Sequence, residues 1–159
     1  MILRPAEPTD AGAIVAFWNP LIRDTAVTFS SEERSANAVA EDINTRCNAF
    51  WVAEDAGQIT GFATYTPFRS GPGYARTKEH TIIVNPAFHG RGVGRALMGR
   101  LEQAARQESV HSLIAGISSE NPDAVRFHTS IGFQQAARLP EVGYKFGRWM
   151  DLILMQKFL

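Results

Sequence analysis

The chain has 159 residues, of which 45% are hydrophobic, and its 16 basic residues balance its 16 acidic ones. This length and composition predict one folded domain with a sizeable core, and the absence of net charge gives no field that would favour nucleic acid or an anionic membrane as a partner. The single cysteine, Cys47, excludes an intrachain disulfide. No apolar run reaches membrane-spanning length and the first residues lack a signal-peptide pattern, so we expect a cytoplasmic protein.

The first part of the chain predicts two helices and three strands. A helix that begins at Thr9 or Asp10 carries one apolar face, and Pro20 should end or kink it. Ser30 and Glu33 have the spacing of a capping box before a second helix. We expect strands over residues 2–6, 50–54 and 58–65, the last two joined as an antiparallel hairpin by a turn at 55–57.

The second part begins with a polar, glycine-containing stretch, residues 66–78, which we expect to be a long irregular loop. A helix over 93–107 follows from the apolar face that Val93, Leu97 and Leu101 share. Asn121 should cap a shorter helix. We expect the remaining strands over residues 81–84, 112–117, 134–139 and 148–158.

The turn between strand 81–84 and helix 93–107 carries the most specific pattern. Pro86 stops the strand, and Gly90, Gly92 and Gly94 lead directly into the helix. Residues without a β-carbon let backbone N–H groups approach a phosphate closely, and the helix dipole adds positive potential at the same place. The stretch therefore predicts an anion site, with a glycine-rich connection that binds nothing as the alternative.

Two common phosphate motifs do not fit this turn. A Walker loop needs Lys and then Ser or Thr after its last glycine, whereas Arg95 and Ala96 stand here. The dinucleotide fingerprint needs a different glycine spacing and an acidic residue after the next strand. The stretch resembles motif A of the GCN5-related N-acetyltransferases, Arg/Gln-x-x-Gly-x-Gly/Ala, which grips the pyrophosphate of acetyl-coenzyme A. His89 stands at the Arg/Gln position, a mild departure.

The resemblance extends over nearly the whole chain. The order of elements is that of these acetyltransferases, and residues 121–133 resemble their motif B. Residues 77–81, His128 and residues 142–151 closely resemble the phosphinothricin and methionine sulfoximine N-acetyltransferases, which acetylate the α-amine of small amino-acid analogues. The resemblance implies an α/β fold with a twisted, mostly antiparallel mixed sheet flanked by helices. It also implies a homodimer.

Acetyl transfer to an amine sets three chemical requirements: a neutral amine, a stabilised oxyanion and a protonated or stabilised thiolate. Glu79 is our candidate base, acting directly or through a water, and a surface carboxylate is the alternative. His128 stands where many members of the superfamily carry a thiolate-protonating Tyr, and an imidazolium is the stronger acid. A polar histidine on a helix face without a catalytic role is the alternative. His80 is predicted either to contact the substrate or a catalytic neighbour, or to be a structural histidine. No spacing of metal ligands is present, so we expect no metal.

The remaining site residues are divided between coenzyme and acceptor. For the coenzyme, we expect Ile82, Ile83 and Val84 beside the pantetheine arm, His89, Gly90, Arg91, Gly92, Val93, Gly94 and Arg95 around the pyrophosphate, and Asn121 as a side-chain partner. For the acceptor carboxylate, Arg69 is the first choice and Arg76 the second, because an arginine fork binds a carboxylate with two hydrogen bonds. A solvated basic loop is the alternative. The other residues expected around the acceptor are Phe29, Ser70, Gly71, Tyr74, Glu79, His80, Thr81 and Lys145, with Trp149 and residues of a second subunit as further walls.

The sequence thus predicts an acetyl-coenzyme A-dependent N-acetyltransferase for a small amino acid or analogue. Two alternatives stay open. A protein or peptide N-acetyltransferase would use the same fold with an open groove. A non-catalytic acyl-coenzyme A sensor would keep the glycine turn but would not need Glu79 and His128.

Overall fold

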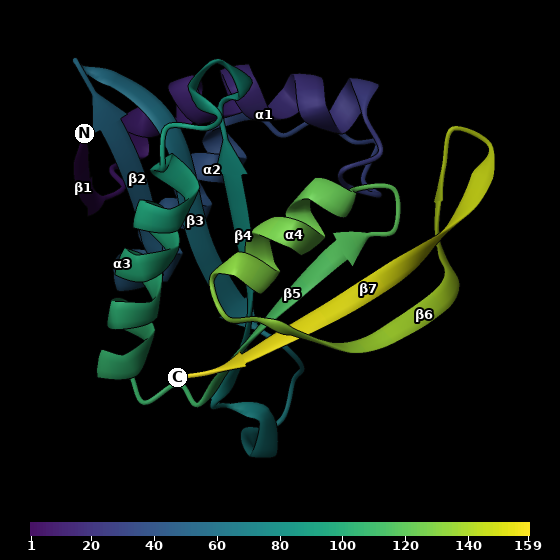
Figure 1. Ribbon diagram of the computed structural model, residues 1–159. Coiled ribbons are helices and arrows are strands. Elements are labelled where there is room, and N and C mark those ends of the chain that lie inside the picture. Colours follow the sequence, from purple (N-terminus) through teal and green to yellow (C-terminus); the bar gives the residue numbers. More distant parts are fainter.

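The computed structural model describes residues 1–159, and a seven-stranded sheet runs through its centre (Figure 1). The strand order is β1-β2-β3-β4-β5-β7-β6, and every neighbouring pair is antiparallel except β4 and β5. The strands are β1 (Ile2–Pro5), β2 (Phe50–Asp55), β3 (Gln58–Pro67), β4 (Thr77–Val84), β5 (Ser112–Ser118), β6 (Gln134–Lys145) and β7 (Arg148–Phe158). The helices are α1 (Ala11–Asp24), α2 (Ala36–Arg46), α3 (Val93–Gln107) and α4 (Pro122–Ser130).

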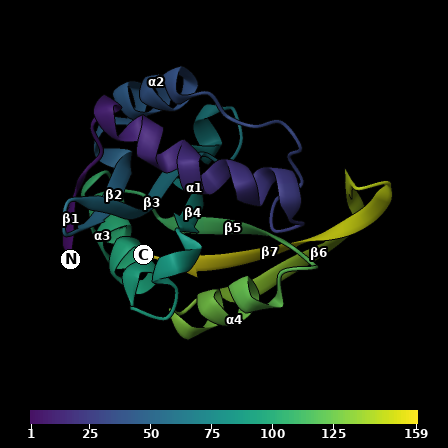
Figure 2. The ribbon, with the colours of Figure 1, turned by 90° about the horizontal axis from the view of Figure 1, so that it is seen from above.

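Helices cover both faces of the sheet, α1 and α2 on one side and α3 and α4 on the other (Figure 2). Strand β2 shows why both faces are covered: Phe50 and Val52 join the core under α1 and α2, whereas Trp51 and Ala53 join the core under α3. All four side chains are buried, as expected for a strand that packs on two layers. This architecture confirms the predicted mixed, mostly antiparallel sheet flanked by helices. None of the helices has the length and apolar character that crossing a bilayer requires.

The two parallel strands stay together for only half of their length. Thr77 to His80 on β4 pair with Ser112 to Ala115 on β5, and no pairing continues beyond these residues. On its other side β4 remains paired with β3 as far as Val84. The edge of β4 that faces β5 is therefore open from Thr81 onward, in the middle of the sheet.

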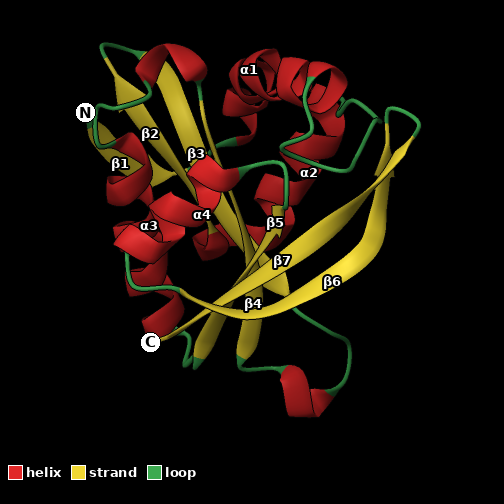
Figure 3. Cartoon of the chain, turned by 45° about the vertical axis from the view of Figure 1, so that its right-hand side comes forward, coloured by secondary structure: helices red, strands yellow, loops and turns green.

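Strands β6 and β7 form a long hairpin that projects beyond the rest of the sheet (Figure 3). The first of these strands is predicted to end at residue 139, but β6 continues to Lys145. A register shift between Leu139 and Gly143 accommodates the extra residues, with Glu141 at a φ of 52°. The tight turn falls instead at Phe146 and Gly147, both with positive φ.

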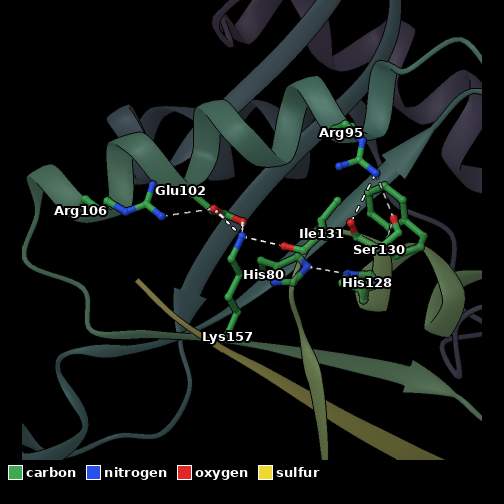
Figure 4. Close-up of polar contacts among 9 residues, drawn as sticks. His80, Arg95, Glu102, Arg106, His128, Ser130, Ile131 and Lys157 are labelled. Carbon is green, nitrogen blue, oxygen red and sulfur yellow. Dashed lines mark hydrogen bonds and ion pairs between the residues drawn. The ribbon is translucent and has the colours of Figure 1, made fainter.

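The opposite end of β7 is tied to both helices of its face. Lys157 Nζ donates to the two carboxylate oxygens of Glu102 on α3, at 2.7 and 2.8 Å, and to the Ile131 carbonyl oxygen after α4, at 2.7 Å (Figure 4). Glu102 is buried, and Arg106 supplies a second, more distant cation at 3.5 Å. The lysine thus fixes β7, α3 and α4 against one another.

Pro20 is predicted to end or kink the first helix near residue 19. The prediction that the helix ends there is wrong, because α1 continues to Asp24. Proline removes the hydrogen bond to the carbonyl four residues earlier, which belongs to Ala16. Both residues are exposed, so water can satisfy that carbonyl. The apolar face of the helix then outweighs the loss.

Two other local predictions also need correction. The capping box does not form at Ser30 and Glu33; instead the Ser35 side chain accepts a hydrogen bond from the Ala38 N–H and caps α2. The irregular segment is shorter than the predicted 66–78, because β3 extends to Pro67 and β4 begins at Thr77. Pairing between these strands has recruited both ends of the expected loop.

Candidate active site

A pocket of about 600 Å³ opens where β4 and β5 separate. Its walls come from α1, the segment 27–30, β4, β5, one side of α4 and Leu152 on β7. We call this the acceptor pocket. Because six elements meet here, the pocket exists only in the folded chain.

A second pocket of about 440 Å³ continues from the first and lies over the glycine turn. We call this the turn pocket. The two pockets share seven lining residues, and they form one continuous groove. The shared residues are Ile82, Val84, His89, Asn121, Asp123, Ala124 and His128.

The glycine turn presents a row of free backbone donors to the turn pocket. Gly90 and Gly92 adopt left-handed φ values of 76° and 79°, and Gly92 is the N-cap of α3. No backbone carbonyl or side chain accepts a hydrogen bond from the N–H groups of residues 90–95. Six consecutive amides at the positive end of a 15-residue helix form a site that fits a diphosphate. The residues present therefore fit the phosphate groups of a coenzyme.

Glu79 places its carboxylate in the acceptor pocket. It lies on β4 at the last stretch paired with β5, opposite Ile114, and is half-buried. The neighbouring strand leaves room for it, because a β-carbon at Gly116 would lie only 2.8 Å from Glu79 Oε1. Burial raises the pKa of the Glu79 carboxyl above its ordinary value. A raised pKa in a cleft is typical of a group that exchanges protons.

His80 and His128 form a buried, hydrogen-bonded pair (Figure 4), and both line the same pocket. His128 Nδ1 lies 2.7 Å from the Ala124 carbonyl oxygen, which only accepts, so this nitrogen carries a proton. In the neutral ring His128 Nε2 then accepts, and His80 Nε2, 2.9 Å away, is the donor. The remaining nitrogen, His80 Nδ1, is buried without a partner.

Burial lowers the pKa of both imidazoles, that of His80 to about 3 with a further contribution from His128. Both rings are therefore neutral at neutral pH. His128 also lies on the wall common to the acceptor and turn pockets.

The structure brings most of the predicted site residues together in the groove. The predicted residues that line one or both pockets are Phe29, Glu79, His80, Thr81, Ile82, Ile83, Val84, His89, Gly90, Gly92, Val93, Gly94, Arg95, Asn121 and His128. The Asn121 side chain also caps α4 by accepting a hydrogen bond from the Ala124 N–H at 3.2 Å. Arg91 belongs to the turn but lies over the Phe88 ring, outside both linings.

Other predicted residues lie elsewhere in the chain. The segment with Arg69 and Arg76 connects β3 to β4 at the end of the sheet away from the glycine turn (Figure 1). Neither pocket is lined by any residue of this segment, which also holds Ser70, Gly71 and Tyr74. No Lys or Arg side chain lines the acceptor pocket. Lys145 is buried and bonded to backbone, and Trp149 is 61% exposed.

Several pocket residues were not among the predicted ones, notably Trp18, Leu21, Gly116 and Leu152. Their positions result from long-range packing, which spacing along the chain does not show. Gly116 is the exception, because a glycine inside an otherwise apolar strand indicates a close approach by another group. Here that group is the Glu79 carboxylate.

Comparison with known proteins agrees with this geometry. Residues 17–133 match the family model described as the Acetyltransferase (GNAT) family. The chain is 38% identical to the L-methionine sulfoximine/L-methionine sulfone acetyltransferase of Salmonella typhimurium, over 98% of this chain and 93% of that protein. It is 34% identical to the phosphinothricin N-acetyltransferase of Streptomyces coelicolor, over 94% and 91% respectively.

A solved structure of yncA, an acetyltransferase from Salmonella typhimurium with its cofactor acetyl-CoA, superposes with a TM-score of 0.94 at 36% identity, covering all of this chain and 94% of that one. The chain belongs to the GNAT acetyltransferase family. It is an acetyl-coenzyme A-dependent N-acetyltransferase, similar in sequence to the enzymes that act on methionine sulfoximine and phosphinothricin.

Proposed function

We propose that this enzyme acetylates the α-amine of a small amino acid or analogue of the methionine sulfoximine, methionine sulfone or phosphinothricin type. The observation that carries the proposal is the half-buried Glu79 carboxylate in an acceptor pocket that is continuous with the glycine turn. The names of the relatives support the acceptor class. We also place the enzyme in the cytoplasm, because its reaction requires a supply of acetyl-coenzyme A.

The turn pocket would hold the coenzyme. The free N–H groups of residues 90–95 would bind its diphosphate, with added charge from Arg91 and Arg95. The open edge of β4 beside Ile82 to Val84 can pair with the amides of the pantetheine arm as it would with an added strand. Asn121, at the entrance to α4, would be a side-chain partner of that arm. These contacts would point the thioester toward the acceptor pocket.

Glu79 is the proposed base. The acceptor arrives as an ammonium, and only the neutral amine attacks a thioester carbonyl, so a carboxylate has to remove one proton, directly or through a water. The desolvation that raises its pKa brings it closer to the operating pH, where a base works best. His80 and Thr81 follow it on β4 and complete this wall of the pocket.

His128 is the proposed proton donor to the departing thiolate. Its position on the wall between the two pockets supports this role. Both of its nitrogens are hydrogen-bonded within the fold, to Ala124 and to His80. The neutral ring carries its single proton on Nδ1, so donation requires that this N–H leave the Ala124 carbonyl oxygen, while Nε2 gives up its bond to His80 and takes the proton that the acetylated amine loses.

The acceptor carboxylate needs a cation that this chain does not place in its own pocket. We therefore propose a homodimer in which Arg69 or Arg76 of a second copy completes the pocket. The projecting hairpin supports a contact between copies, because it exposes a run of large apolar side chains. They are Leu139, Val142, Tyr144, Phe146 and Trp149.

The acceptor class is tested by mixing enzyme, acetyl-coenzyme A and each of the three amino-acid analogues, and measuring release of free thiol. We expect turnover with at least one of them. No thiol release with any of the three, together with activity on a peptide or a polyamine, would overturn the proposed acceptor class. Binding of coenzyme without transfer to any amine would favour a sensor.

The dimer is tested by mixing two inactive variants, Glu79→Gln and a chain in which both Arg69 and Arg76 are changed to Ala. If the arginines act in the partner's pocket, mixed dimers contain one intact site and recover part of the activity. No recovery, in a sample shown by light scattering to contain dimers, would place the arginines in their own chain or outside the site.

A further inference from the structure

Lys145 is a buried ammonium that no carboxylate accompanies. It is 3% exposed, near the tip of β6, and makes no ion pair. Its Nζ donates to the backbone carbonyl oxygens of Ile22 at 2.5 Å, Thr25 at 2.7 Å and Thr28 at 3.0 Å. All three N–H donors of the ammonium are therefore used.

These three carbonyls belong to the C-terminal turn of α1 and the segment that follows it. The last carbonyls of a helix lack partners within the helix and carry the negative end of its dipole. A lysine at this position satisfies the carbonyls and is stabilised by the dipole without an acidic partner. Lys145 therefore attaches segment 25–30, which has no helix or strand of its own, to the β6–β7 hairpin.

The attached segment is a wall of the acceptor pocket, to which Val27, Thr28, Phe29 and Ser30 contribute. A second contact from the same strand fixes its aromatic residue. A β-carbon at position 143 would lie 2.6 Å from the ring of Phe29, so only glycine leaves room for the ring against β6.

We propose that Lys145 and Gly143 are positioning residues for the acceptor: together they set where Phe29 and segment 25–30 lie, and so the width of the acceptor pocket. The inference rests on the proposed function of that pocket. Neither residue lines the turn pocket, so their effect should be confined to the acceptor side.

The test compares Lys145→Met and Gly143→Ala with two controls. Lys145→Met keeps the length of the side chain but removes its three donors, and Gly143→Ala forces the Phe29 ring to move. Lys78→Met changes a lysine on β4 whose side chain makes no hydrogen bond or ion pair, and Gly99→Ala adds a methyl group where no atom lies within 4 Å. The KM for methionine sulfoximine and the dissociation constant for coenzyme A are measured for each variant.

We expect both test variants to raise the KM for the acceptor by about tenfold, which is a loss of roughly 1.4 kcal/mol, and to change the coenzyme dissociation constant less than twofold. The controls should leave both quantities unchanged. An unchanged acceptor KM in both test variants would overturn the inference, and so would a parallel loss of coenzyme affinity, because it would indicate general unfolding.

A double variant identifies Phe29 as the link. If Gly143→Ala acts through the ring, combining it with Phe29→Leu should do no more harm than Phe29→Leu alone, whereas independent effects would add. Additive effects would overturn the coupling.

Amide hydrogen exchange supplies a readout that does not depend on activity. Lys145→Met should speed exchange in residues 24–30 while the amides of α3 keep their protection. Unchanged exchange in residues 24–30 would show that the lysine does not hold the segment. A wild-type enzyme that is silent on every amino acid would instead refute the proposed function, even where exchange reveals the attachment.

Discussion

The two sides of the groove are assembled in different ways. The turn pocket is built mostly from one continuous stretch, from β4 through the first turn of α3, where the chain itself presents its amides. The acceptor pocket gathers segments that are far apart, and the bond from Lys145 to Thr25 spans 120 residues. The site proposed for the coenzyme phosphates thus results from local geometry, whereas the pocket proposed for the acceptor depends on long-range contacts. Substitutions should therefore affect the two sides separately.

The largest expected effect on activity comes from a substitution in the acceptor pocket, near its boundary with the turn pocket. Glu79→Gln keeps the shape of the side chain but cannot take a proton, so kcat should fall by about 10²- to 10⁴-fold. The coenzyme dissociation constant should stay within twofold. Rates by thiol release and affinity by calorimetry check this, with the exposed Glu41→Gln as the control. An unchanged rate would remove Glu79 as the base.

The same residue predicts the direction of the pH dependence. Because burial raises the pKa of Glu79, a larger fraction is protonated and inactive at mildly acidic pH than for an exposed carboxylate. In the wild type kcat/KM should therefore rise with pH through that raised pKa. In Glu79→Gln this limb of the profile should disappear, and its persistence would assign it to another group.

The pair of His80 and His128, on the pocket wall, predicts a large effect of pH on the free energy of unfolding. Burial lowers the pKa of both rings in the folded protein, whereas an unfolded histidine protonates near pH 6.5, so the unfolded chain binds more protons below that pH. Full stability is present above about pH 6.5 and is lost as the pH falls, by up to about 1.4 kcal/mol per pH unit for each buried histidine.

His80→Gln removes one of the two titrating groups and keeps a side-chain donor for His128. From pH 7 to pH 5 the unfolding free energy of this variant should fall less steeply than that of the wild type. Below pH 6.5 the two slopes should differ by about 1.4 kcal/mol per pH unit. Urea unfolding at the two pH values measures the difference. Equal slopes would show that His80 titrates normally in the folded protein.

A smaller effect is expected on the coenzyme side. Gly92→Ala imposes a left-handed φ on a residue with a β-carbon, at a cost of about 1–2 kcal/mol that displaces the amides of the turn. Coenzyme affinity should fall by about tenfold, with little change in acceptor KM at saturating coenzyme. This is the reverse of the pattern expected for Lys145→Met. Gly12→Ala, where no atom lies within 4 Å of the new methyl, is the matched control.

The same contrast explains how much the sequence alone could predict. The glycine turn and the helix over residues 93–107 follow from local pattern, and the structure contains the helix at the predicted bounds, whereas β4 begins at Thr77, before the predicted strand 81–84. Local pattern failed where tertiary contacts decide. The apolar face of α1 carries that helix past Pro20, and pairing with β7 carries β6 past Leu139.

The predicted role of Lys145 shows the same limit. A lysine in a family-like tail suggested a contact with the acceptor, but in the structure its ammonium donates to carbonyls of the last turn of α1 and of the segment after it. Which carbonyls a side chain reaches across 120 residues depends on the folded arrangement of the whole hairpin. Gly116 is an intermediate case. A glycine inside a strand indicates that another group comes close to the backbone, but only the structure identifies that group as the Glu79 carboxylate.

The open edge of β4 has a consequence beyond catalysis. Without coenzyme, residues 81–84 leave backbone donors and acceptors unpaired inside the sheet, and a strand with unpaired groups is prone to open or to recruit another chain. A ligand that covers this edge adds its binding free energy to folding, about 2.7 kcal/mol at a hundred times its dissociation constant. If the coenzyme pairs with this edge as proposed, saturating acetyl-coenzyme A should therefore raise the free energy of unfolding by that amount.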